Sequence, residues 1–233
     1  MKITLPDNSF RDLPDGSSGY DLAKDIGPGL AKSAVAITVN GVQKDLHDKI
    51  EGDASVSIIT IDSDDGLDIM RHTLTAQVLA RAIKNLYPKS QLAIGPTIED
   101  GFYYDVETDK TISIDDLQKI EDEMKNIVKT NSSITKKLVS KSDALKVFKS
   151  LKEPYKEEII SESDQKDDFQ LYYQDKEEFV DLCRGPHLPN LSFIGSFKLT
   201  KVSGAYWKGD SKNTMLTRIY GTAWKNDKDL EKY

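Results

Sequence analysis

The segment FVDLCRGPH, residues 179–187, contains the only cysteine of the chain and one of its three histidines. Cys183 and His187 lie four positions apart, Asp181 precedes them, and an Arg-Gly-Pro sequence separates them. Proteins use a thiol, an imidazole and a carboxylate for metal binding, for nucleophilic catalysis and for proton transfer. The segment therefore allows three kinds of site.

A metal site would need more ligands than this segment offers. A C-x3-H spacing supplies two ligands, and a second pair is usually placed on a helix, where positions i and i+4 share a face. The histidine in a predicted helix, His72, has Ala76 at that position. His72, Cys183 and His187 thus form at most a three-ligand set, which would suit a catalytic zinc with water in the fourth position. We expect no metal, although the spacing leaves this set open.

A cysteine nucleophile needs an exposed thiolate in electropositive surroundings. Asp181 would raise the thiol pKa instead, and a lone cysteine is commonly buried, so we interpret Cys183 as a residue of a pocket wall. His187 follows a rigid Gly-Pro turn and is suited to proton transfer or to holding a water molecule. A structural loop histidine fits the sequence of this segment equally well. We expect His47 to lie on the surface.

Length and composition describe a folded chain without membrane segments. The 233 residues suffice for one large domain or two ordinary ones, with 38% hydrophobic and 30% charged residues. No apolar run approaches the roughly 18 residues of a membrane span, and the first ten residues lack the apolar core of a signal peptide. A single cysteine forms no internal disulfide. We therefore expect a cytoplasmic protein.

The charge is unevenly distributed. A net charge of −7 argues against nucleic-acid binding by bulk electrostatic attraction. Residues 195–225, however, contain both tryptophans and many cations with a single acid: Lys198, Lys201, Lys208, Lys212, Arg218 and Lys225 against Asp210. Cations interleaved with aromatic residues can bind phosphates and stack on bases. A twisted β-hairpin with core aromatics and solvated lysines fits the same pattern.

Hydropathy and turn residues divide the chain into two units. Residues 1–62 predict a hairpin, a serine-capped helix that ends at a Gly-Pro-Gly sequence, two strands joined by an Asn-Gly turn, and a last strand. This order resembles a β-grasp domain of the ubiquitin-like TGS type. DSDDG, residues 62–66, is expected to be a linker.

The second unit, residues 63–233, is expected to be an α+β domain with an antiparallel sheet and a long helix. Apolar residues recur at helical spacing up to Pro88, which predicts an amphipathic helix over 67–88. The other predicted elements are strands within 92–106 and 133–140, helices over 113–131 and 141–151, and mainly strands and turns thereafter.

Several long motifs resemble one family. IGPTIEDGFYYD, DLCRGPH, VSGAYWKGDSKN and RIYGTAW are similar to the TGS and editing domains of bacterial threonyl-tRNA synthetases, over essentially the whole chain. The resemblance implies that water attacks the ester of misacylated seryl-tRNA(Thr), with no cofactor in these domains. ATP, magnesium and zinc are expected only in the absent aminoacylation core. It further implies tRNA(Thr) as partner, through its acceptor arm and 3′ end, a homodimeric parent enzyme and a monomeric fragment.

The resemblance also implies roles for particular residues. Lys156, His187 and His72 would be catalytic. The pocket would be completed by Tyr104, Asp181, Cys183, Gln77 and Thr73. The tRNA would contact Lys198, Lys201, Lys208, Lys212, Arg218 and Trp207. No metal ligand is implied.

The family pattern H-x3-H on the helix is incomplete here. One register pairs His72 with Ala76, and the other pairs Thr73 with Gln77. The registers differ by one residue, so an insertion would need a helical bulge, a feature often found at functional sites. We expect His72 in the pocket and Gln77 at its periphery. An editing-inactive module that binds the tRNA acceptor arm remains an alternative, as does a zinc-dependent hydrolase.

Overall fold

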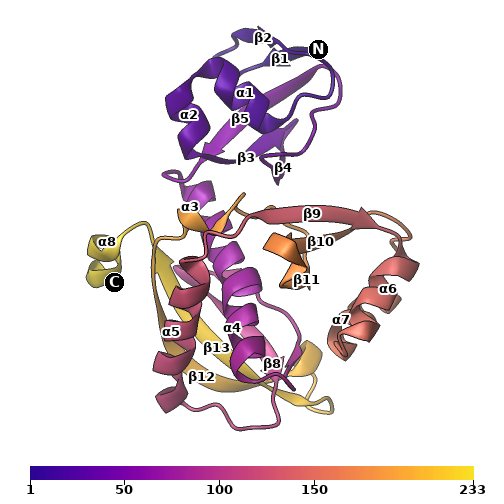
Figure 1. Ribbon diagram of the computed structural model, residues 1–233, viewed down its shortest axis with the longest axis vertical. Coiled ribbons are helices and arrows are strands. Elements are labelled where there is room, and N and C mark those ends of the chain that lie inside the picture. Colours follow the sequence, from indigo (N-terminus) through magenta and orange to yellow (C-terminus); the bar gives the residue numbers. More distant parts are fainter.

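The computed structural model describes residues 1–233, and Figure 1 shows two bodies of secondary structure stacked along its longest axis. The upper body is a five-stranded sheet in the order β2-β1-β5-β3-β4, in which β1 and β5 are parallel and the other neighbours antiparallel. Its elements are β1 (Lys2–Thr4), β2 (Phe10–Asp12), α1 (Gly19–Ile26), α2 (Pro28–Ser33), β3 (Ala34–Val39), β4 (Val42–Asp45) and β5 (Ala54–Thr60).

This first unit has the predicted β-grasp arrangement. The Ser18 side chain caps α1 by accepting a hydrogen bond from the Asp21 backbone, and Asp21 reciprocates as a capping box. Leu22 on α1 is fully buried in a core with Ile3 and Ile37 of the sheet. The short helix α2 begins at Pro28, inside the Gly-Pro-Gly sequence, and was not predicted as a separate element.

The predicted linker at residues 62–66 is wrong in part. The Ser63 side chain accepts a hydrogen bond from Gly66 N and begins α3 (Asp64–Thr73), with Asp64 and Asp65 in the first turn. Three acids and a glycine are typical of a linker, but acids also stabilise a helix N-terminus through the macrodipole. The two units are therefore joined by the start of the long helix.

The long helix contains a π segment. Between α3 and α4 (Ala80–Leu86), residues Leu74–Leu79 form a π-helix, η1, in which Ala80 N donates to Thr75 O. A π turn holds one residue more than an α turn. The π segment begins directly after His72 and Thr73 and includes Ala76 and Gln77, the later positions of the two candidate registers.

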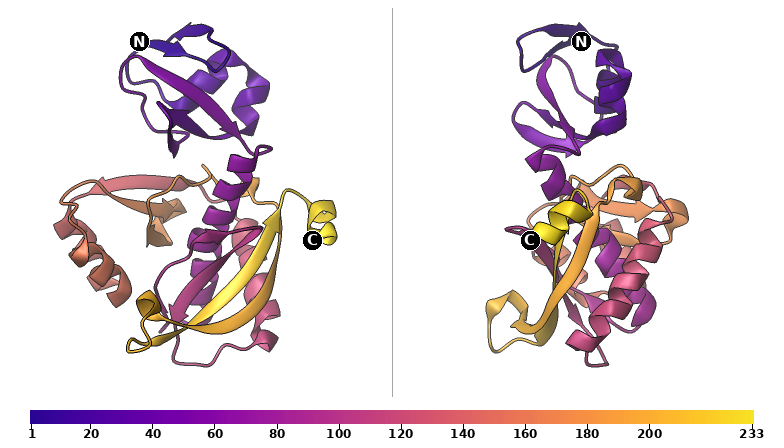
Figure 2. Two further views of the ribbon diagram at one scale, coloured as in Figure 1. Left: turned by 180° about the vertical axis from the view of Figure 1, so that it is seen from behind. Right: turned by 90° about the vertical axis from the view of Figure 1, so that its left-hand side faces the viewer.

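Two sheets and the helices that cover them complete the second unit (Figures 1 and 2). The larger, antiparallel sheet has the order β12-β13-β8-β6, with β7 also paired to β8, and the smaller has the order β11-β10-β9. The strands are β6 (Gln91–Leu92), β7 (Thr97–Ile98), β8 (Gly101–Glu107), β9 (Ile134–Val139), β10 (Phe169–Gln174), β11 (Val180–Leu182), β12 (Ser196–Tyr206) and β13 (Met215–Trp224).

The remaining helices are α5 (Leu117–Val128), α6 (Lys141–Ser150), α7 (Pro154–Glu162) and α8 (Asp227–Lys232), with short 3-10 turns at 114–116, 175–177, 191–193 and 207–209. The main core lies between the long helix, α5 and the larger sheet, and includes Leu74, Phe102 and Ile120. A separate cluster packs α6 and α7 against β10. The predicted α+β class is confirmed, whereas α7 was missed. None of the helices combines the length and the apolar character that a membrane span requires.

Candidate functional site

The predicted site residues come from four separate segments. Tyr104 lies on β8, Lys156 on α7, Asp181 on β11, and His72 near the end of α3. Cys183 follows Asp181 by two positions, so the alternation of a strand directs both side chains to one face. All of these residues lie where β11 faces the long helix.

A buried ion pair occupies one end of this face. Lys156 Nζ lies 2.8 Å from Asp181 Oδ1, with side chains only 4% and 2% exposed. Tyr104 OH donates to Asp181 Oδ2 at 3.3 Å, and Leu182 N donates to Asp181 Oδ1 at 2.8 Å. Burial raises the pKa of the Asp181 carboxyl, and the Lys156 ammonium counteracts that effect. The three donors together hold the carboxylate in a fixed orientation.

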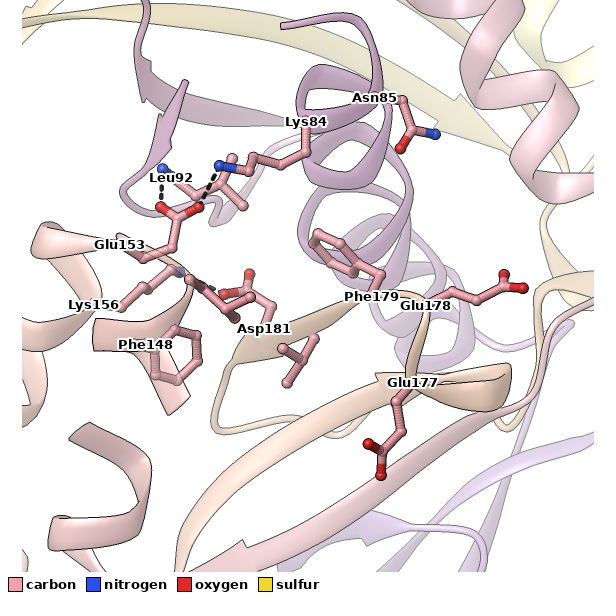
Figure 3. Close-up of a pocket in the computed structure, with 12 residues that line it drawn as sticks. Lys84, Asn85, Leu92, Phe148, Glu153, Lys156, Glu177, Glu178, Phe179 and Asp181 are labelled. Atoms are coloured by element: carbon pink, nitrogen blue, oxygen red, sulfur yellow. Dashed lines mark hydrogen bonds and ion pairs between the residues drawn. The ribbon is translucent and has the colours of Figure 1, made fainter. Parts of the chain in front are cut away.

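This ion pair lines a pocket of about 190 Å³ (Figure 3). Beside the ion pair, Lys84 Nζ pairs with Glu153 Oε1 at 2.7 Å, and Leu92 N donates to Glu153 Oε2 at 2.7 Å. Burial raises the pKa of the Glu153 carboxyl. Glu177 and Glu178 also line this pocket. Its lining therefore contains more acidic residues than lysines.

A histidine pair occupies the other end of the face. The rings of His72 and His187 are stacked, with centroids 4.6 Å apart and planes inclined by 9°. His72 Nε2 lies 2.7 Å from Cys183 Sγ, and the Tyr172 ring meets the His187 ring edge-on at 4.5 Å. Burial lowers the pKa of His72 to about 4. Burial and the neighbouring His72 lower the pKa of His187 well below its ordinary value, so both imidazoles are neutral at pH 7.

The Cys183 thiol is not activated as a nucleophile. Burial, with the Asp181 charge as a further cause, raises the pKa of Cys183 to about 12, although the Gly185 N–H partly opposes this. A thiol with such a pKa carries almost no thiolate at neutral pH. Cys183 instead closes the wall between the ion pair and His72.

The hydrogen bonds of Thr73 define the tautomer of His187. Thr73 Oγ1 accepts from Leu188 N at 3.0 Å and lies 3.0 Å from His187 Nδ1. Because Thr73 Oγ1 makes no other hydrogen bond as a donor, we infer that its hydroxyl donates to Nδ1 and that the imidazole proton resides on Nε2. His187 Nε2 is buried without a partner. An unpaired buried N–H is costly, and an acceptor such as water or a ligand oxygen would satisfy it.

Gln77 is tied to the small sheet. It is fully buried, its Nε2 donates to Tyr172 O at 3.4 Å, and Gln174 Nε2 donates to Gln77 O at 2.8 Å. His72 and Thr73 both contact the Cys183–His187 loop. His72 belongs to the first candidate register and Thr73 to the second, so each register contributes one residue that contacts the loop. Gln77, the other residue of the second register, contacts β10 instead.

His72, Cys183 and His187 are also the residues best placed to hold a metal. Their ligand atoms all lie within 4.8 Å of one another. Three ligands and a water would complete a catalytic zinc site. His187 could bind a metal through Nε2 only with its proton on Nδ1 and Thr73 Oγ1 as the acceptor, which is the reverse of the tautomer inferred above.

The lysine and the histidine do not open into the same hollow. Lys156 and Asp181 line the pocket of Figure 3, whereas His187 lines a hollow beside Asp45 of the first unit. The Lys156 charge nevertheless reaches the Cys183 thiol, where it lowers the pKa. Asp181 lines only the first of these hollows, and Cys183 lines neither of them.

The predicted tRNA contacts are largely engaged within the protein. Lys208 pairs with Glu158 and Glu162, and Arg218 makes two hydrogen bonds to Asp105, at 2.7 and 2.8 Å. Trp207 is buried. The others are Lys198, which lies 3.4 Å from Glu121, Lys201, whose ammonium lies over the Tyr220 ring, and Lys212, whose side chain is exposed without a partner. On this hairpin, Lys201 and Lys212 are the most available for phosphates.

Two features of the site could not be predicted from local sequence patterns: the burial of Lys156, and the contacts of Tyr172 and Asp45 with the His187 loop. Only the family resemblance indicated Lys156, because its burial depends on helix α7, which was not predicted. Tyr172 and Asp45 contact the His187 loop although no motif marked them. His47 is exposed as predicted.

Comparisons with known proteins agree with these two units. The TGS domain family matches residues 1–60, and the family described as threonyl and alanyl tRNA synthetase second additional domain matches residues 170–220. The chain is 47% identical over 231 residues, or 99% of its length, to threonine–tRNA ligases of Prochlorococcus marinus and Hahella chejuensis. The same values hold for the ligase of Acidithiobacillus ferrooxidans. The chain spans 35–36% of the length of these relatives.

Proposed function

Because the chain belongs to the threonyl-tRNA synthetase family, with a TGS domain followed by an editing domain, we propose that it hydrolyses the ester of misacylated seryl-tRNA(Thr). Serine differs from threonine by one methyl group, which a binding pocket discriminates by only about 1–3 kcal/mol. A synthetic site therefore needs a second, hydrolytic site to remove serine. The observation that carries the proposal is the buried Nε2 atom of His187, which has no hydrogen-bond partner.

The chemistry of the site favours direct attack by water. The Cys183 thiol is protonated, so an acyl-enzyme intermediate on sulfur is disfavoured. Neutral His187 donates from Nε2, which suits either the attacking water or the oxygen that becomes negative in the tetrahedral intermediate. Lys156 uses one of its three donors for Asp181. Its remaining donors can hold the terminal ribose in the pocket that Lys156 lines, and the attack of water on the ester releases serine and the 3′ hydroxyl.

Deacylation of seryl-tRNA(Thr) by the purified chain tests this proposal. We expect hydrolysis well above the buffer rate and slower cleavage of threonyl-tRNA(Thr). The variants His187→Ala and Lys156→Ala should lower the rate by at least 100-fold, which corresponds to about 2.7 kcal/mol. Lys137→Ala, which removes an exposed lysine of β9, is the matched control and should retain the rate. Hydrolysis equal to the buffer rate would refute the proposal.

The same purified chain separates editing from acceptor-arm binding alone. We propose that Lys201 and Lys212 contact phosphates of the tRNA acceptor arm, since neither is paired with an acid. Replacing both with alanine should weaken tRNA affinity and its dependence on salt concentration. Retained tRNA affinity with no ester cleavage in the unmodified chain would instead identify an editing-inactive binding module.

A further inference from the structure

A carboxylate of the first unit reaches the candidate site of the second. Asp45, at the end of β4, is 14% exposed. Its Oδ1 accepts from His187 N at 2.9 Å, and its Oδ2 accepts from Tyr172 OH at 2.7 Å. Lys136 Nζ of β9 lies 3.1 Å from the same Oδ2. All three donors belong to the second unit.

Two of these donors control the surroundings of the imidazole. The first is the backbone of His187 itself, and the second is the hydroxyl of Tyr172, whose ring meets the imidazole edge-on at 4.5 Å. Gly185 packs on the same hydroxyl: a Cβ at Gly185, where φ is +64°, would lie 2.0 Å from Tyr172 OH. The turn that carries His187 therefore rests on Tyr172, and Asp45 holds both.

Asp45 is itself held in place from two sides. Asp48 Oδ2 accepts from Asp45 N at 3.2 Å and pairs with Lys136 Nζ at 2.6 Å. Lys136 thus joins the two carboxylates of the first unit to β9 of the second. Besides its contact with Lys136, Asp45 therefore makes two hydrogen bonds that go directly to the backbone of His187 and to the hydroxyl of Tyr172.

We propose that Asp45 is a positioning residue of the editing reaction, by which the TGS domain completes the editing site. The inference rests on the proposed hydrolysis and adds a role for the first unit. Asp45 fixes the backbone of His187, Tyr172 fixes its ring, and Thr73 fixes its tautomer through Nδ1. The hydrogen-bond donor at Nε2 of His187 then points in one fixed direction, as catalysis by preorganised donors requires.

The variants Asp45→Ala and Asp45→Asn, made in the full 233-residue chain, test this role. Asp45→Ala removes the acceptor of His187 N, and we expect kcat for seryl-tRNA(Thr) deacylation to fall about tenfold, with little change in KM. Asp45→Asn keeps one carbonyl acceptor, so its kcat should lie between those of Asp45→Ala and the unmodified chain. Asp25→Asn, in an exposed ion pair of the same domain, is the control and should match the unmodified chain.

Hydrogen exchange provides a readout that does not depend on activity. Amide exchange of the segment 183–188 should accelerate in Asp45→Ala and remain unchanged in Asp25→Asn, with protection of the long helix retained in both. Unchanged exchange in Asp45→Ala, or an equal kcat for Asp45→Ala and the unmodified chain, would overturn the inference. If the unmodified chain lacks hydrolysis while the exchange effect is present, the proposed function fails and the contact from Asp45 to the His187 loop stands.

Discussion

Removing the Lys156 ammonium leaves a carboxylate buried without its counter-ion. In Lys156→Met, Asp181 retains Tyr104 OH at 3.3 Å and Leu182 N at 2.8 Å as its donors. Because both partners of the ion pair are at most 4% exposed, solvent would stabilise the unpaired carboxylate only weakly. Breaking such a buried pair costs about 3–5 kcal/mol, so we expect the free energy of unfolding to fall by about 3 kcal/mol at pH 8.

The loss should depend on pH in a defined direction. Without Lys156 the pKa of Asp181 rises further, because the ammonium is the main group that opposes the effect of burial. An acid whose pKa is higher in the folded than in the unfolded chain stabilises the fold at low pH, and this stability is lost as pH rises through the folded pKa. The variant should therefore be closer to the unmodified chain at pH 5 than at pH 8.

Urea unfolding monitored by tryptophan fluorescence measures the free energy of unfolding of the second unit, which contains Lys156. Both tryptophans, Trp207 and Trp224, lie in that unit. Lys137→Met removes an exposed lysine and should leave the midpoint unchanged. The double variant Lys156→Met/Asp181→Asn should recover part of the loss at pH 8, because it removes the uncompensated charge. The reasoning is refuted if Lys156→Met unfolds like the unmodified chain at pH 8, or if the double variant is no more stable than the single one.

Three further predictions concern the histidine end of the site. Cys183→Ala should keep the deacylation rate within about tenfold of that of the unmodified chain, because a thiol with a pKa of about 12 is no nucleophile. Loss of all activity in this variant, together with a seryl-thioester trapped on Cys183 of the unmodified chain, would contradict this prediction. Treatment with a chelator should leave the deacylation rate unchanged, and one equivalent of zinc in the purified chain, lost together with activity, would contradict a metal-free site. Burial lowers the pKa of His72 from 6.5 to about 4. Between these pH values the unfolded chain binds a proton that the folded chain does not bind, so the free energy of unfolding should fall as pH decreases from 6.5 to 4. His72→Gln should reduce that fall in urea titrations at several pH values, and an unaltered pH dependence would show that His72 is not buried in its neutral form.

Local chemistry made much of the fold predictable. The serine cap of α1, the Asn-Gly turn between β3 and β4, and the apolar spacing of the long helix each specify one element through nearby residues. The order of the first five strands then indicates the β-grasp arrangement. The linker at 62–66 was mistaken because the same acids favour both a solvated loop and a helix N-terminus.

The site was predictable only where a motif marked it. DLCRGPH and the RH pair led to Cys183, His187 and His72, which the structure brings together. A helical bulge was considered only as the consequence of an insertion, and the structure contains a π segment at 74–79. Which residues share a wall depends instead on long-range packing. Asp45 lies 142 positions from His187 and belongs to another unit, so no local spacing connects the two residues.

The position of the seryl group in a complex tests the central claim most directly. A crystal structure of the chain with a non-hydrolysable seryl-adenosine analogue, in which an amide replaces the ester, would show the surroundings of the reacting carbonyl. We predict that His187 Nε2 lies within about 3 Å of that carbonyl oxygen or of a water beside it, with Lys156 near the ribose. An analogue bound where neither His187 nor Lys156 can contact it would contradict the account.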